Sequence, residues 1–264
     1  MLKSTSTTAR AFVLLHALLF GACSEAPTHE GGSAGGANVM PGTGGSAPVS
    51  PAARQRNPEC TAPSGISNAP ATIAETLTLI NALPKPLTLP CFLQSLARPL
   101  AINATNSLFS LQPAQGARSP RIFVFERSMV MSIVPAGDGA NLLEFGETRA
   151  ELRSLKAELA FPVYAALPPS APFEDLMFNE QLTKCAVCHA SESEEATTTG
   201  VRSFVSAAIR PVPSDRVGAA KLAQELAACD FRSEPERCVV LDALLGWGPV
   251  SDADFDPEMP TFFR

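Results

Sequence analysis

The sequence has few histidines, no basic stripe and no long apolar run. Three His occur among its 264 residues, and the formal net charge is −6. Such a surface, without clustered Lys or Arg, excludes nucleic acid as a natural partner. No stretch reaches the ~18 apolar residues of a membrane helix. The 24 Pro favour short elements and many loops over long helices.

The first 22 residues (1–22) are predicted to form a secretory signal. Lys3 and Arg10 supply positive charge around the start of the apolar run Ala11–Phe20, which is too short to span a bilayer comfortably. The run leads into Phe-Gly-Ala-Cys, and these residues resemble the lipobox of bacterial lipoproteins. The resemblance implies cleavage before Cys23 and lipidation of that cysteine. Simple signal cleavage without lipid is the alternative.

A stretch rich in Gly, Ser, Ala and Pro follows, residues 23–57, with almost nothing to bury. This composition predicts a flexible tether. Behind a lipidated cysteine, such a tether would hold a globular body off a membrane surface. We therefore expect a lipid-anchored protein of the cell envelope, periplasmic or outer-membrane. The Ser after Cys23 favours the outer membrane, because it is not the Asp that resembles an inner-membrane retention signal of enteric bacteria.

The first half of the body, residues 58–165, contains several runs in which apolar and polar residues alternate. The run that includes Leu155 is the most regular, with apolar side chains on one face and Lys156 and Glu158 on the other. One short helix is expected before these runs, over Thr72–Leu83. This half therefore predicts a β-rich domain, an antiparallel sheet or a small sandwich.

The second half, residues 166–264, has helical patterns instead. The segments Ser214–Cys229 and Ser233–Trp247 each begin with a candidate N-cap Ser, and the later one has Pro235 in its first turn. The expected fold class is α+β, with the β-rich domain followed by a mostly α domain.

Seven Cys are informative in an oxidising compartment. When Cys23 and the pair Cys185 and Cys188 are set aside, an even number remains, which allows three pairings. The pairing that keeps each disulfide inside one half and closes a modest loop is expected, although free buried thiols are an alternative. These disulfides are Cys60–Cys91 and Cys229–Cys238.

The most specific motif is Cys-Ala-Val-Cys-His, from Cys185 to His189. Zinc normally needs four N or S ligands, and His189 is the only His of the body. A thioredoxin-like pair needs a βαβ pattern, which this half of the sequence does not offer. Covalent haem fits the motif, because Cys185 and Cys188 can reach the two vinyl groups while His189 binds the iron.

These five residues resemble the haem-attachment motif of c-type cytochromes, and Pro-Glu-Met-Pro at 257–260 resembles the distal-ligand loop of that family. The resemblance implies one covalent haem c, attached through Cys185 and Cys188, with His189 and Met259 as iron ligands. The sequence departs from the family after Met259, because only a short tail follows where a packing helix is usual.

The function predicted from these observations is haem-based electron transfer by a cell-envelope c-type cytochrome lipoprotein. The protein would be an electron carrier rather than an enzyme, held at the membrane by its lipid anchor and serving a redox partner protein. One alternative is a non-haem secreted binding or structural lipoprotein in which the Cys185 and Cys188 pair is a local disulfide. The other is a five-coordinate haem sensor, in which Met259 is not a ligand.

Overall fold

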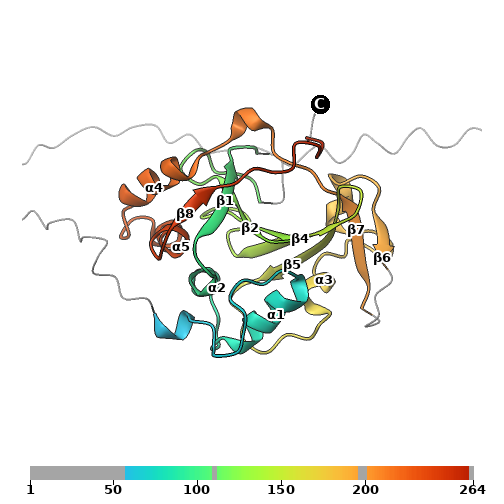
Figure 1. The fold of residues 1–264 in the computed structure, drawn as a ribbon, viewed down its shortest axis with the longest axis horizontal. Coiled ribbons are helices and arrows are strands. Elements are labelled where there is room, and N and C mark those ends of the chain that lie inside the picture. The colour runs from blue at the N-terminus through green and yellow to red at the C-terminus, as the bar shows by residue number, and fades with distance from the viewer. Residues whose placement is uncertain (1–56, 109–111, 196–200, 262–264) are drawn as a thin grey trace, which may run out of the picture. The chain divides into compact units, whose positions relative to one another are not determined.

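A mixed sheet of eight strands organises the part of the chain that the computed structural model describes, which is residues 57–108, 112–195 and 201–261 (Figure 1). The strands lie in the order β6-β7-β5-β4-β3-β2-β1-β8. Their bounds are β1 Leu100–Thr105, β2 Arg121–Glu126, β3 Met129–Ile133, β4 Leu142–Arg149, β5 Arg153–Ala160, β6 Ser193–Glu195, β7 Ser203–Ala207 and β8 Val250–Asp252. The α-helices are α1 Ile73–Ala82, α2 Leu89–Ser95, α3 Ala171–Glu174, α4 Ala219–Ala227 and α5 Pro235–Leu245. Short 3-10 turns are η2 Pro58–Cys60, η3 Lys184–Val187 and η4 Pro213–Asp215.

The middle of the sheet is an antiparallel meander, in which β1 to β5 pair in sequence order. β7 adds to β5 and β6 adds to β7, both antiparallel. β8 adds to the other edge and runs parallel to β1. The β-rich prediction for the first half of the body is therefore correct for the strands, which form an antiparallel arrangement there.

The predicted fold class is wrong for residues 166–264, which do not form a mostly α cytochrome c-like domain. Helices α4 and α5 do occur where helical patterns were expected. However, β6, β7 and β8 from this half belong to the same sheet as β1 to β5. The Phe and Val of β7 suit a pleated, half-buried surface, and their pairing with β5 comes from the tertiary fold rather than from local periodicity.

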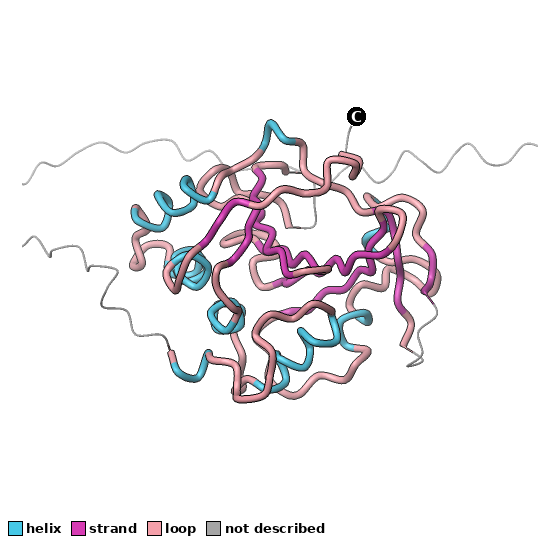
Figure 2. The backbone as a smooth tube through the Cα atoms, viewed as in Figure 1, coloured by secondary structure: helices cyan, strands magenta, loops and turns pink. Residues whose placement is uncertain are grey.

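One face of the sheet packs into the hydrophobic core, together with α1 and α2. Leu155 and Leu159 of β5 lie on this face, as their spacing predicted. Thr76 of α1 reaches Met129 of β3, and Phe92 of α2 packs on Phe161 with ring centroids 6.0 Å apart. In Figure 1, α1 and α2 lie on one side of β4 and β5, and the C-terminal segment lies on the other. Figure 2 shows the strands as one curved layer between them.

The opposite face of the sheet, called the polar face below, carries polar and charged side chains among aromatic ones. Residues directly opposite one another on antiparallel strands point to the same side. The register therefore aligns Phe125, Val130, Gly146, Lys156 and Phe204 in one row across five strands. A neighbouring row, two positions along, contains Phe123, Ser132, Glu144 and Glu158. Lys156 and Glu158 nevertheless are only 7% and 4% exposed, so other parts of the chain cover this face.

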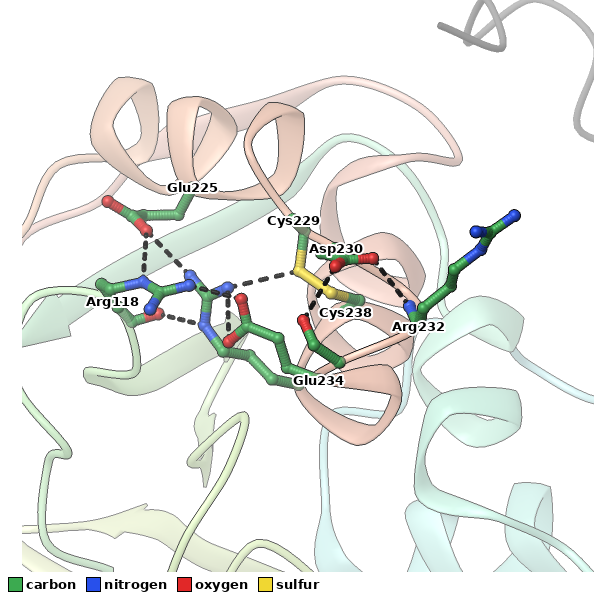
Figure 3. Close-up of a disulfide and its surroundings, with 9 residues drawn as sticks. Arg118, Glu225, Cys229, Asp230, Arg232, Glu234 and Cys238 are labelled. Carbon is green, nitrogen blue, oxygen red and sulfur yellow. Dashed lines mark hydrogen bonds and ion pairs between the residues drawn. A yellow bond between two sulfur atoms is a disulfide. The ribbon is translucent and has the colours of Figure 1, made fainter. Parts of the chain in front are cut away.

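Both expected disulfides, Cys60–Cys91 and Cys229–Cys238, are present in the structure. The first joins η2 to α2, and the second joins the end of α4 to α5, as Figure 3 shows.

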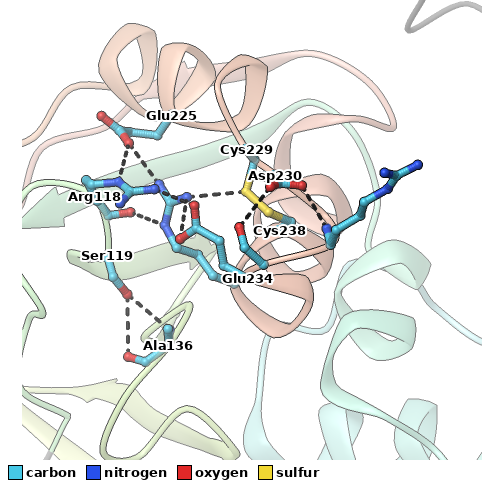
Figure 4. A network of polar contacts seen from close by, with 11 residues as sticks. Arg118, Ser119, Ala136, Glu225, Cys229, Asp230, Glu234 and Cys238 are labelled. Atoms are coloured by element: carbon cyan, nitrogen blue, oxygen red, sulfur yellow. Dashed lines mark hydrogen bonds and ion pairs between the residues drawn. A yellow bond between two sulfur atoms is a disulfide. The ribbon is translucent and has the colours of Figure 1, made fainter. Parts of the chain in front are cut away.

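A polar network surrounds the second disulfide (Figure 4). Its centre is Arg237 of α5, whose side chain is 4% exposed. The guanidinium donates to Glu225 at 2.8 Å and to the backbone carbonyl of Arg118 at 2.8 Å. Arg118 itself pairs with Glu225 and Glu234. This network ties α4 and α5 to the loop that precedes β2.

Candidate functional site

A cavity of about 460 Å³ lies on the polar face of the sheet. Strands β2 to β5 form its floor, and three other segments border it. These segments are the turn around η3, the stretch 208–215 and the C-terminal stretch 255–259. Among the described residues, none that lines the cavity belongs to an α-helix.

Aromatic and aliphatic side chains form much of the wall. Phe255 packs edge-on against Phe123 and Phe125 of β2, with ring centroids 5.0 and 4.9 Å apart. Leu176 and Met259 also line the cavity. The C-terminal segment is held in place by Arg210, which donates to the carbonyl of Met259 at 2.8 Å and to that of Pro257 at 3.2 Å. The apolar side of the cavity is therefore held in place by hydrogen bonds from the Arg210 side chain to backbone carbonyls.

An ion pair between Arg121 of β2 and Glu144 of β4 forms one polar side of the cavity. Ser132 of β3 lies between them and accepts a hydrogen bond from Arg121 at 2.8 Å. The Ser132 hydroxyl lies 3.1 Å from the side-chain oxygen of Gln112. The Ser132 hydroxyl is also 3.2 Å from Oε2 of Glu144, the same carboxylate oxygen that pairs with Arg121. The Nε of Arg121 is buried without a hydrogen-bond partner among the described residues.

Lys156 of β5 lies on the polar face, directly opposite Gly146, which has no side chain. Its ammonium donates to the hydroxyl of Ser154 at 2.6 Å. No described carboxylate forms an ion pair with it. Burial is the main cause that lowers the pKa of Lys156 from 10.5 to about 8. The residue is therefore a buried cation whose bonding capacity is mostly unused by the chain.

The turn around η3 holds Cys185 and Cys188, and His189 follows it. Thr183 caps η3, because its hydroxyl accepts from the Cys185 amide at 3.1 Å. The same hydroxyl donates to Glu192 at 2.5 Å. Cys185 and Cys188 are free thiols, so the local disulfide that one alternative requires is not formed. Burial raises the pKa of Cys185 to about 11 and also raises that of Cys188.

His189 is fixed by the neighbouring strand. Its Nδ1 lies 2.8 Å from the carbonyl oxygen of Ala207, so Nδ1 carries the proton and donates. Burial, aided by the positive charge of Lys156, lowers the pKa of His189 to about 4. The ring is therefore neutral at physiological pH, and Nε2 is its acceptor nitrogen.

The structure brings the four residues predicted around a haem to one cavity, since Cys185, Cys188, His189 and Met259 all line it. The prediction of one covalent haem c is nevertheless wrong. Among the described residues, no group of three or more His, Cys, Asp or Glu side chains could hold a metal ion. Four of the other cysteines are used in disulfides, and the motif lies in a 3-10 turn beside a β-sheet instead of in a helical cytochrome domain.

No sequence motif marks the polar floor of the cavity as a site. Lys156 and Glu158 were assigned to the polar face of a strand, and that assignment is correct. An alternating strand predicts such a face without showing whether it meets water or a cavity. The signal that could have helped is Gly146, a glycine inside a strand, which often marks a close approach of a ligand or backbone.

The signal segment, Cys23 and the tether up to residue 56 lie outside the described residues. No helix of the described ranges is both long and apolar enough to cross a membrane. No protein-family model, curated protein or solved structure matches this chain.

Proposed function

We propose that this protein is a cell-envelope binding protein that takes a small, largely apolar organic molecule into the cavity on the polar face of its sheet. The observation that carries the proposal is the cavity itself. Its volume of about 460 Å³ is in the range of small-molecule sites. Apolar and aromatic walls with a few fixed polar groups are also typical of such sites.

The position of Gly146 supports this proposal, because Gly146 lies directly opposite Lys156 on the neighbouring strand. A larger residue at 146 would project into the space above the floor, beside Ser154. The contacts of a Cβ added there are ordinary, at 3.6 Å from the Ser154 hydroxyl, and no positive φ demands glycine. The absence of a side chain at this position therefore preserves volume in the cavity.

Location in the envelope remains part of the proposal. Two disulfides in a protein of this size favour an oxidising compartment. The half-buried thiols of Cys185 and Cys188 are compatible with it, because thiols whose pKa is raised oxidise slowly. The predicted lipid anchor at Cys23 would place the cavity near a membrane surface.

A dye-binding experiment tests the proposal. Phenylnaphthylamine, a neutral dye that fluoresces in apolar surroundings, is titrated into the wild type, Gly146→Ala and Gly146→Leu. We expect binding to the wild type, a modest loss in the Ala variant and loss of tenfold or more in the Leu variant, whose side chain projects into the cavity and reduces the space for the dye. Near-UV circular dichroism checks that each variant is folded. Absence of saturable binding to the wild type, or equal binding to all three proteins, would contradict the proposal.

A further inference from the structure

We propose that the molecule held in this cavity is an amphipathic organic anion whose charged group pairs with Lys156. The inference rests on the proposed function and narrows its ligand class. Lys156 is nine-tenths buried and lines the cavity, and among the described residues only the Ser154 hydroxyl is its hydrogen-bond partner. A buried ammonium without a counter-charge is unfavourable, so an anion that enters the cavity would satisfy it.

Two carboxylates, those of Glu144 and Glu192, act electrostatically on Lys156, but each of them binds another group. Glu144 pairs with Arg121 of β2. Glu192 accepts from both the amide and the hydroxyl of Thr183, at 2.8 and 2.5 Å. The described residues therefore supply partial electrostatic compensation for Lys156, but none of their carboxylates pairs with it directly.

The side chains that line the cavity carry a net positive charge, whereas the whole protein carries a net negative charge. Six basic side chains line it against four acidic ones, whereas the chain carries a net charge of −6. Among the basic residues, Arg153 bonds only to backbone carbonyls and a serine hydroxyl, and its Nε is buried without a partner among the described residues. A local excess of positive charge in an acidic protein favours an anion at this site.

The shape of the cavity indicates an organic anion instead of an inorganic one. Phe123, Phe255 and Leu176 would contact a hydrocarbon or aromatic body, while the ammonium of Lys156 contacts the charged end. A small inorganic ion would leave those apolar walls uncovered. The expected ligand class is therefore a carboxylate or sulfonate with an aromatic or aliphatic body.

Two dyes with the same aromatic skeleton distinguish the contribution of the ligand's charge to binding from the contribution of its apolar body. Anilinonaphthalene sulfonate carries an anionic group, and phenylnaphthylamine does not. We expect Lys156→Met to weaken binding of the sulfonate dye about tenfold or more, as for loss of a hydrogen bond to a charged group, and to change binding of the neutral dye less than about twofold. Lys221→Met, on an exposed part of α4 away from the cavity, should change neither.

The outcomes distinguish this inference from the proposed function. Failure of both dyes to bind the wild type, or full binding of both to Gly146→Leu, would overturn the proposed function and this inference with it. Retained binding of both dyes by Lys156→Met, or equal weakening of both, would overturn the inference alone.

A measurement on the wild type covers the case in which Lys156→Met does not fold. Octanoate and octanol, which differ at the charged end, compete for bound phenylnaphthylamine. We expect octanoate to displace the dye at concentrations at least tenfold below octanol, and sulfate at the same ionic strength to displace none. Equal potency of octanoate and octanol would overturn the inference, as would displacement by sulfate at the concentrations at which octanoate acts.

Discussion

Replacing Lys156 with Met is expected to stabilise the folded protein at neutral pH. Lys156 is 7% exposed and forms one hydrogen bond to a hydroxyl, so its ammonium loses hydration for little compensation. Burial is the largest cause that lowers its pKa from 10.5 to about 8. At a pH where Lys156 is charged in both the folded and the unfolded protein, this lowered pKa corresponds to a destabilisation of the folded state by about 3 kcal/mol.

The effect of Lys156 on stability has a defined pH dependence. Because its folded pKa lies below the unfolded value, the unfolded chain binds more protons between pH 8 and pH 10.5, and stability rises with pH through that window. From pH 7 to pH 9 the wild type should gain about 1 kcal/mol from this residue. Cys185 has the opposite effect, because its pKa is raised to about 11 in the folded protein. The folded protein therefore loses stability as the pH rises, but only above about pH 9.

Urea unfolding of the wild type and Lys156→Met at pH 7, 8 and 9 measures both quantities. Met approximates the length of the lysine stem, so we expect the variant to be more stable by about 1 to 3 kcal/mol at pH 7 and the advantage to shrink by pH 9. Lys221→Met removes an exposed lysine and should shift stability by no more than about 0.5 kcal/mol at every pH. A variant that is less stable than the wild type at pH 7, or a difference that does not change with pH, would refute the reasoning.

Three further predictions concern other parts of the chain. Arg237→Ala should lower the free energy of unfolding by about 3 kcal/mol in urea, because it removes a buried guanidinium that donates to both Glu225 and the backbone carbonyl of Arg118. Exposed Arg232→Ala should change it by no more than about 0.5 kcal/mol, and equal effects would contradict this. Cys185 and Cys188 should react with iodoacetamide at pH 7 far more slowly in the native than in the denatured protein, as followed by peptide mapping, since burial raises both pKa values. Cys23→Ala should move the protein from the membrane to the soluble fraction, and unchanged fractionation would count against lipidation.

The sequence predicted the local features of the fold well and its assembly poorly. Alternation in β5 identified both the strand and its two faces, and cysteine spacing identified both disulfides. The short strands β7 and β8 were missed, because their pairing partners are far away in sequence. β8, for example, has three residues and pairs with β1 about 150 positions earlier, so no local pattern specifies it.

The motif from Cys185 to His189 lies at the candidate site, but the haem chemistry predicted from it is wrong. Its residues do line a cavity together with Met259, although 70 positions separate His189 from Met259. The haem prediction rested almost wholly on these five residues, which carry no information on the surrounding fold. In the described part of the chain they lie at a 3-10 turn beside a β-sheet. Lys156 belongs to no sequence motif, because its significance comes from burial without a charged partner among the residues that the structure describes.

The cavity follows from the way the chain covers the second face of its sheet. Helices α1 and α2 pack against the apolar face, where Leu155 and Met129 fill the interface. The polar face is covered by irregular segments instead, and these are held mainly through their backbone, as in the bonds of Arg210 to the carbonyls of Met259 and Pro257. Such segments lack the broad side-chain surface that a helix would press into the sheet, so space remains above Lys156. A cover of this kind preserves a cavity with a charged floor, and an anion inside would offset the cost of burying that charge.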